Sequence, residues 1–389
     1  MDITNLNVAV VGSGTGGAAT ALLLARQGAQ VTLFERIRQV TALGAGIGLA
    51  ENGLAVLERL GLLAAIEAVS CDVGTGRVVT GEGRLLLAAP TPAPRVRMLR
   101  RQALQQVLLD AVAGEPRIAM RRGAEVLAAR PDGTLDAAAP EGVDTVRADL
   151  VIGADGVHSR VRQGGAFGAR VGAPGIPYVR AIVPEGLARG EEAWTAAGLF
   201  GSFPVPGGTY LYASAGTAAC AAAAEAADLE AFRAIWARAY APAGAMFTSL
   251  SSWHDLIVTR VVRVDCDRWV DGRLVLLGDA AHAMAPNLGQ GGNSALVDAA
   301  VLVDELRRGP DLPSALQAWQ VRRQPKVRAV ADLSGRLGAL AEITHPAARW
   351  VRDRVLPPIA RMAASRSAGA MVLQEPPAVL AGTVVSRSS

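Results

Sequence analysis

The stretch VVGSGTGG, Val10 to Gly17, decides the fold of this chain. Its glycines fit the G-x-G-x-x-G spacing at Gly12, Gly14 and Gly17. The first glycine permits a tight turn, the second lets the backbone approach a pyrophosphate, and the third lets a helix pack closely on a strand. Apolar patterns around it predict a strand over 7–11, a helix over 18–27 and a strand over 30–34. The stretch therefore predicts the opening β–α–β unit of a Rossmann-like domain that binds a dinucleotide.

A carboxylate ends the second strand of this unit. Glu35 stands about twenty residues after the glycine turn, where an acidic side chain accepts both hydroxyl groups of an adenosine ribose. Its negative charge repels a 2′-phosphate. The predicted resident nucleotide is therefore FAD or NAD rather than NADP.

Two further predicted strands, 148–154 and 273–277, lead into Asp155 and Asp279. Ligands of open α/β sheets bind at the carboxyl ends of strands. Beyond Asp279, Pro286 and the glycines of 289–292 precede a predicted helix, whose first N–H groups favour an electron-rich or anionic group. Each aspartate alone is equally well explained as a turn residue or a helix cap.

Composition narrows the class of protein. The 389 residues have room for two modest domains or one elaborated domain. Three cysteines without metal or redox spacing favour a reducing, cytoplasmic setting, and four well-separated histidines predict no metal site. The amino end has no secretory signal pattern, and no stretch approaches the length of a membrane span. The basic residues behind the net charge of +4 are spread along the chain, so no nucleic-acid partner is expected.

Four separated motifs follow one another along the chain: GSGTGG with Glu35-Arg36, Arg101-x-x-Leu104, GADGVHSRVR at 153–162 and GDAAHAMAPNLGQGGN at 278–293. In this order they resemble the motifs of the single-component FAD-dependent aromatic hydroxylases of the para-hydroxybenzoate and salicylate hydroxylase type. The likeness runs from Asn7 to about Arg328. It implies an α/β fold with a Rossmann-like FAD-binding domain, an inserted mostly-β substrate domain and a C-terminal helical segment.

The aromatic residues locate the inserted domain. Thirteen of the sixteen lie between Phe167 and Trp269, and this part of the chain reads as mostly β with one helix near 228–240. The predicted boundaries are an FAD-binding part over 1–166, a substrate domain over 167–268, a return to the FAD-binding domain over 269–310, and C-terminal helices and tail over 311–389. A hairpin within 77–98 is expected to join the substrate sheet.

The resemblance also assigns cofactor contacts. Glu35 holds the adenosine ribose, Arg101 contacts FAD, and Asp279 binds the ribityl or pyrophosphate region. The turn at Asp155 is associated with both FAD and the nicotinamide cofactor, and Pro286 with the backbone of 288–291 lies beside the isoalloxazine ring. The full predicted set is Gly12, Gly14, Gly17, Glu35, Arg36, Arg101, Asp155, Asp279, Pro286, Leu288, Gly289 and Gly291.

Two departures from the family pattern weaken any transfer of substrate preference. Family members often carry Gln-Pro where this chain has Ala50-Glu51, and Glu where it has Val297. His282, which belongs to the GDAAH turn, is predicted to be structural rather than a general base. No catalytic side chain is assigned, because the cofactor supplies the hard chemistry.

The predicted activity is that of an FAD-dependent monooxygenase. NAD(P)H reduces FAD, dioxygen adds to the reduced flavin, and the flavin hydroperoxide hydroxylates or epoxidises an aromatic or polycyclic small molecule. GAGIG at 44–48 lacks the spacing of a second dinucleotide motif, since Leu49 stands where a glycine is needed, so NADH or NADPH is expected to bind transiently. Monomer and homodimer both remain open.

Substrate contacts are expected from the aromatic-rich sheet and from two loops, with Ile47, Arg180, Phe203, Tyr210, Tyr212 and Asn287 as candidates. Arg180 suits an ionised phenol or a carboxylate. Simple packing of the sheet explains each aromatic candidate equally well.

Two alternative functions remain. One is a flavin-dependent reductase or dehydrogenase that never activates dioxygen. The other is a non-redox cyclase or binding protein that keeps FAD as a scaffold. Flavin-dependent halogenases rely on an active-site lysine, and the single lysine here, Lys326, lies beyond the flavin motifs, which argues against halogenation.

Overall fold

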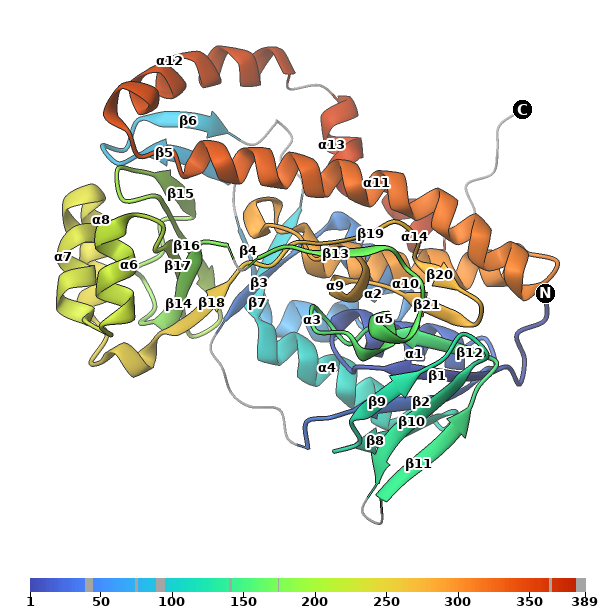
Figure 1. Cartoon of the computed structure of the whole chain (residues 1–389). Helices are drawn as coiled ribbons and strands as arrows, with labels where there is room; N and C mark the ends of the chain where they lie inside the picture. Colours follow the sequence, from blue (N-terminus) through green and yellow to red (C-terminus); the bar gives the residue numbers. More distant parts are fainter. Residues whose placement is uncertain are drawn as a thin grey trace.

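A six-stranded sheet forms around the glycine turn (Figure 1). The computed structural model describes residues 1–38, 45–73, 76–88, 95–139, 142–173, 175–363 and 366–382. In spatial order the strands are β20 (Val270–Asp271), β21 (Leu274–Leu276), β12 (Leu150–Gly153), β1 (Asn7–Val11), β2 (Gln30–Glu35) and β8 (Ile118–Arg122). From β21 to β8 all neighbours run parallel, and β20 is antiparallel to β21. The carboxyl ends of β1, β2, β12 and β21 therefore meet at one edge, as predicted from Gly12, Glu35, Asp155 and Asp279.

Helix α1 (Thr15–Ala25) follows the glycine turn and packs against α4 (Arg101–Ala113) and α10 (Gln290–Arg308). Small residues permit this close approach. A Cβ atom at Gly16 would lie 2.9 Å from Leu277 and 3.0 Å from Ala295. A three-stranded antiparallel sheet packs on the same core. It consists of β9 (Val126–Ala129), β10 (Thr134–Ala139) and β11 (Gly142–Arg147), and the short helix α5 (Arg160–Gly164) packs against β9.

A second, seven-stranded sheet carries most of the aromatic residues. Its order is β18 (Ile257–Arg260), β14 (Pro177–Val183), β17 (Gly208–Ser214), β16 (Leu199–Val205), β15 (Glu191–Trp194), β5 (Arg77–Thr80) and β6 (Leu85–Ala88). All neighbours are antiparallel except β15 and β5. The predicted hairpin at 77–88 thus joins this sheet. The predicted hairpin range extended to residue 98. Residues 96–98 do not join the seven-stranded sheet, because they belong to β7 of another sheet.

One face of the seven-stranded sheet is covered by α6 (Ala218–Glu225), α7 (Leu229–Ala239) and α8 (Ala241–Thr248), with Phe200, Phe232 and Trp236 in the shared core. The prediction of one helix in this part of the chain was wrong. It missed α6 and α8 because an almost pure alanine run and an Ala-Pro-Ala-Gly start show no amphipathic period. Their helical state depends on packing against α7 and the sheet.

A three-stranded sheet lies between the two large ones, with β7 (Val96–Arg100) flanked by β3 (Gly46–Ala50) and β4 (Ser70–Asp72). A Cβ atom at Gly46 would lie 2.5 Å from the ring of Tyr210, and one at Gly292 would lie 3.0 Å from Ile47. In strand β3, Gly46 therefore contacts the aromatic sheet, and the next residue, Ile47, contacts the start of α10. The elements α2 (Glu51–Arg59) and α3 (Leu63–Ala68) follow it, and a strand pair of β13 (Ala169–Val171) and β19 (Val264–Cys266) links the two large sheets.

The predicted C-terminal helical segment is confirmed. The long helix α11 (Leu312–Ala341) runs beside both large sheets, and α12 (Pro346–Ala363), α13 (Arg366–Leu373) and α14 (Pro377–Leu380) follow (Figure 1). Among the described residues, no helix combines the length and the apolar character needed to cross a membrane. The exact domain boundaries stay predictions, and residues 383–389 of the predicted tail and Gly44 of GAGIG lie outside the described residues.

Candidate active site

A cavity of about 1020 Å³ lies between the six-stranded and seven-stranded sheets. Its walls are the carboxyl edge of the parallel sheet, the start of α10, strand β3 and the uncovered face of the aromatic sheet. Every predicted cofactor residue except Gly17 and Leu288 lines it, and so do all six predicted substrate candidates. The fold thus brings the two predicted sets together around one space.

The three glycines of the turn have different structural roles. Gly12 has a φ of +95°, and a Cβ atom there would lie 2.5 Å from the carbonyl oxygen of Ala154. A Cβ atom at Gly17 would lie 1.9 Å from the carbonyl oxygen of Gly12, so Gly17 packs α1 onto β1. At Gly14 a Cβ atom would meet no heavy atom within 4 Å. Gly14 therefore leaves its backbone bare toward the cavity, which is the opening a pyrophosphate needs.

Glu35 ends β2 beside this turn. Its carboxylate accepts hydrogen bonds from the Ser13 backbone N–H at 3.0 Å, the Ser13 hydroxyl at 2.8 Å and the Ile37 N–H at 2.9 Å. These contacts hold the acid at the cavity edge. The sequence pattern did not single out Ser13, whose position between Gly12 and Gly14 was the available signal.

Asp155 is both a helix cap and a cavity residue. Its Oδ2 accepts the backbone N–H groups of Arg160 at 2.7 Å and Val161 at 3.2 Å, which caps α5. Its Oδ1 is buried and has no hydrogen-bond partner among the residues described. Burial raises the pKa of this carboxyl group. One oxygen is thus used by the fold, and the other is available to a ligand.

Asp279 begins the one-turn helix α9 (Asp279–His282) after β21 and is exposed to the cavity. Its Oδ1 lies 4.0 Å from the position of a Cβ atom on Gly291. Gly289, at φ +62°, precedes the first turn of α10 and has open space around its Cβ position. A carboxylate and the N-terminus of a long helix therefore face the same part of the cavity.

Asn287 lines the cavity from the 3-10 turn η2 (Pro286–Leu288). Its Oδ1 would lie 2.7 Å from a Cβ atom on Gly338, so α11 packs closely on this side chain. Its Nδ2 is buried without a partner within the described part of the chain. This amide is suitable as a hydrogen-bond donor to a bound molecule.

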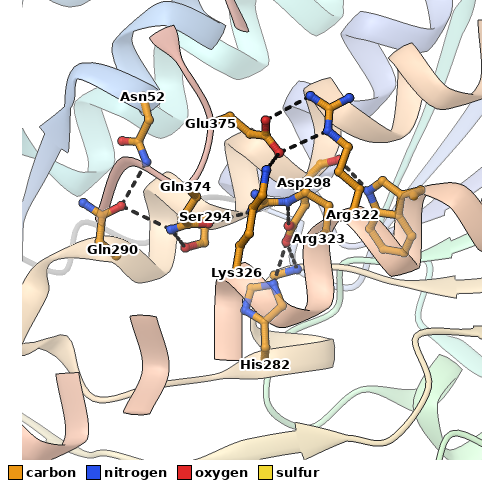
Figure 2. Close-up of polar contacts among 12 residues, drawn as sticks. Asn52, His282, Gln290, Ser294, Asp298, Arg322, Arg323, Lys326, Gln374 and Glu375 are labelled. Carbon is orange, nitrogen blue, oxygen red and sulfur yellow. Dashed lines mark hydrogen bonds and ion pairs between the residues drawn. The ribbon is translucent and has the colours of Figure 1, made fainter. Parts of the chain in front are cut away.

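His282 lies outside the cavity lining, in a buried ionic cluster (Figure 2). Its Nε2 lies 2.5 Å from Asp298 Oδ2, and the Arg323 Nε donates to Asp298 Oδ1 at 2.9 Å. The backbone N–H of Gly278 also donates to Asp298, at 3.2 Å. His282 therefore ties α9 to α10 and α11 and has a structural role.

The C-terminal segment is bound to the same helices. Figure 2 shows Gln374 between Arg323, which donates to its Oε1 at 2.7 Å, and Ser294, which accepts from its Nε2 at 2.7 Å. Glu375 accepts from Arg322 at 3.0 Å and from Lys326 at 2.7 Å. The single lysine thus holds the C-terminal segment and does not line the cavity.

Two polar cavity residues of the aromatic sheet were missed, Tyr178 on β14 and Glu192 on β15. The alternation in β14 that places Arg180 on the cavity face also places Tyr178 there. For Glu192 the sequence carries no comparable signal, because Glu191 precedes it directly and the two acids point to opposite faces of the sheet.

Comparison with known proteins agrees with this geometry. Residues 5–175 and 223–334 match the model of a family described as an FAD binding domain. The chain belongs to this FAD-binding family. The unmatched segment between these ranges contains β14 to β17, which form the aromatic wall of the flavoprotein's cavity.

Relatives of the flavoprotein are oxygenases. Aurachin C monooxygenase/isomerase of Stigmatella aurantiaca is 30% identical, over 91% of this chain and 94% of that protein. Kynurenine 3-monooxygenase of Salinispora arenicola is 33% identical, over 84% of this chain and 78% of that protein. The solved structure of the tetrameric form of 2-methyl-3-hydroxypyridine-5-carboxylic acid oxygenase is 28% identical, covers 91% of this chain and 98% of its own, and superposes with a TM-score of 0.77.

These relatives confirm the predicted fold, cofactor and enzyme class. The flavoprotein is an FAD-dependent monooxygenase with a Rossmann-like FAD domain, a strand-rich insert and C-terminal helices.

Proposed function

We propose that the flavoprotein uses NAD(P)H and dioxygen to hydroxylate an electron-rich aromatic molecule that carries an anionic group. The observation that carries this proposal is one cavity that has two chemically different ends. Gly14 and Asp279 line one end, and Arg180, Tyr210 and Tyr212 line the other. FAD occupies the first end in this proposal, and the substrate lies against the aromatic sheet.

The residues of the first end fit FAD. Glu35 would accept the ribose hydroxyls, the bare backbone at Gly14 would face the pyrophosphate, and Asp279 would bind the ribityl region. The N–H groups from Gly289 to Gly291 would donate toward the flavin ring, where they stabilise negative charge. When bound and reduced, FAD supplies the activation of dioxygen.

The substrate end combines aromatic surface with the positive charge of Arg180. The rings of Phe203 and Tyr212 are stacked and nearly parallel, with centroids 6.2 Å apart and an interplanar angle of 14°. Arg180 lies close enough to Tyr178 and Tyr210 for its charge to act on both phenols. A guanidinium group pairs well with a carboxylate. The carboxylic acid in the name of the solved relative supports an aromatic acid as the substrate class.

A cytoplasmic location is part of this proposal. Cys71, Cys220 and Cys266 are all free thiols, which fits a reducing compartment.

The decisive experiment follows one labelled oxygen atom. The purified holoprotein is expected to oxidise NADH or NADPH under labelled dioxygen, and to incorporate one labelled atom into an aromatic acid from a panel that includes kynurenine and para-hydroxybenzoate. Flavin reduction without incorporation into any turned-over substrate would favour a reductase. No flavin reduction by either nicotinamide would favour a non-redox role.

Asp279→Ala is expected to weaken FAD binding about 10- to 100-fold, because one hydrogen bond to a charged group contributes about 1.5–3 kcal/mol. The measurement is the flavin-to-protein ratio after gel filtration, with a fluorescence titration of the apoprotein. Asp144→Ala removes an exposed carboxylate of β11 outside the cavity and is the matched control. Unchanged flavin content in Asp279→Ala would remove Asp279 from the cofactor site.

A further inference from the structure

A row of polar residues crosses the cavity face of the seven-stranded sheet. The strand register places Arg180 opposite Tyr212, Tyr212 opposite Gly201, and Gly201 opposite Glu192. Residues that are directly paired in a sheet point to the same face. Arg180, Tyr212 and Glu192 accordingly all line the cavity. A cation, a phenol and a carboxyl group thus lie in line along the wall of the substrate end.

The glycine in this row makes contact between the other members possible. A Cβ atom at Gly201 would lie 2.2 Å from Tyr212 Cζ and 2.5 Å from the Tyr212 hydroxyl oxygen. The ring of Tyr212 therefore lies across β16 at the one place in the row without a side chain. From there its hydroxyl donates to Glu192 Oε1 at 2.5 Å. Any larger residue at position 201 would displace the ring from Glu192.

The setting of Glu192 makes its ionised carboxylate a stronger proton acceptor than an exposed one. Burial raises the pKa of Glu192, and its hydrogen bonds from Tyr212 and Trp194 offset part of that rise. Burial also raises the pKa of Tyr212 well above its usual value. The titratable or charged groups that surround the pair are Tyr178 and Arg180 of β14, Tyr210 of β17, Glu342 at the end of α11, and Arg352 of α12 over the Trp194 ring.

We propose that Tyr212 and Glu192 together accept a proton from the substrate, which is an aromatic ring with an ionisable hydroxyl group facing this pair. The inference rests on the proposed function and names the group that makes the ring electron-rich. The substrate O–H bond breaks, and its electron pair stays on the substrate oxygen. That proton moves to the Tyr212 oxygen while the proton of Tyr212 moves to Glu192 Oε1.

The result is a substrate phenolate beside a neutral Glu192 carboxyl group. Arg180, on the other side of Tyr212 in the row, stabilises the new negative charge. A carboxyl group whose pKa is raised toward the working pH is an effective proton acceptor. The two ends of the row therefore have different roles in this proposal. Glu192 receives the proton through Tyr212, and Arg180 stabilises the substrate phenolate.

A second tyrosine–carboxyl pair provides the matched control. Tyr178 donates to Glu342 Oε1 at 3.0 Å, and Ser214 donates to Glu342 Oε2 at 3.0 Å. Glu342 does not line the cavity, and its contacts attach the end of α11 to the sheet. A purely structural tyrosine–carboxylate contact is thus available for comparison in the same protein.

The experiment uses para-nitrophenol as the probe, because its ionised form absorbs visible light. Difference spectra of the oxidised holoprotein with the probe give the apparent pKa of the bound phenol. Relative to the wild-type protein, Glu192→Gln and Tyr212→Phe are expected to raise that pKa by at least about one unit, a tenfold change in ionisation. Gly201→Ala, which removes neither polar group, is expected to do the same by displacing the ring. Glu342→Gln is expected to leave it unchanged.

An equal phenolate fraction in the wild-type protein and in Glu192→Gln would overturn the proposal. Failure of the wild-type holoprotein to bind the probe would also overturn it. The flavin content of each variant, measured in the same samples, shows whether the cofactor end is intact. Labelled-oxygen incorporation tests the proposed function separately, so a failed ionisation test with intact incorporation leaves that function standing.

Discussion

Gly14→Val is expected to weaken FAD binding at least about 100-fold, which corresponds to about 2.7 kcal/mol, while the free energy of unfolding of the apoprotein changes by less than about 1 kcal/mol. The reason is the open space at this position. A Cβ atom on Gly14 would meet no heavy atom within 4 Å, and the Gly14 φ of −60° is allowed for any L-residue. The valine side chain would occupy the cavity where the backbone otherwise faces the pyrophosphate.

Gly17→Ala is the contrasting variant, three residues along the same turn. Its methyl group would lie 1.9 Å from the Gly12 carbonyl oxygen, so α1 must move away from β1. Overpacking of this kind costs about 1–3 kcal/mol of stability. Urea unfolding of both apoproteins and fluorescence titration with FAD measure the two effects. Normal FAD affinity in Gly14→Val would show that the pyrophosphate does not pass this turn.

Asp298→Ala is expected to destabilise the protein by about 3–5 kcal/mol, because it leaves Arg323 and His282 buried without their shared carboxylate. The side chains of Asp298 and Arg323 are both fully buried, and the cluster joins α9, α10 and α11. Asp144→Ala breaks an exposed ion pair with Arg121 and is expected to cost at most about 1 kcal/mol. Urea unfolding at neutral pH measures both costs.

The same variant is expected to change the acid dependence of stability. Burial alone would raise the pKa of Asp298, but the charges and hydrogen bonds of His282 and Arg323 outweigh burial and lower this pKa below its usual value. A group with a lowered folded-state pKa stabilises the protein fully above its unfolded pKa, and this contribution disappears as the pH falls through the folded-state pKa. The stability difference between wild type and Asp298→Ala should therefore narrow below about pH 4. A constant difference down to lower pH would contradict the assignment.

The cofactor end of the site could be predicted from the sequence because its determinants are local. A positive φ at Gly12, the close packing of Gly17 and the acid at the end of β2 each depend on a few neighbouring residues. The apolar strands that precede Asp155 and Asp279 join the same sheet as β1. Because these strands run parallel, their carboxyl ends meet at one edge of the sheet.

The substrate end was predicted only in part. Alternation along β17 correctly placed Tyr210 and Tyr212 on one face. It could not identify Glu192, because the adjacent acids Glu191 and Glu192 occupy opposite faces and either could have pointed into the cavity. In the structure Glu191 faces the other way, where it accepts a hydrogen bond from Tyr240 at 2.5 Å and pairs with Arg77.

The sequence by itself thus determined the nucleotide turn, the family and the type of fold, because backbone constraints and apolar periods are encoded within short stretches. The tertiary structure decided that Gly201 lets Tyr212 reach Glu192, and that Gln374 and Glu375 hold the C-terminal segment on α10 and α11. These contacts join residues far apart in the chain. They depend on strand register and burial, which exist only once the sheets and helices have packed together.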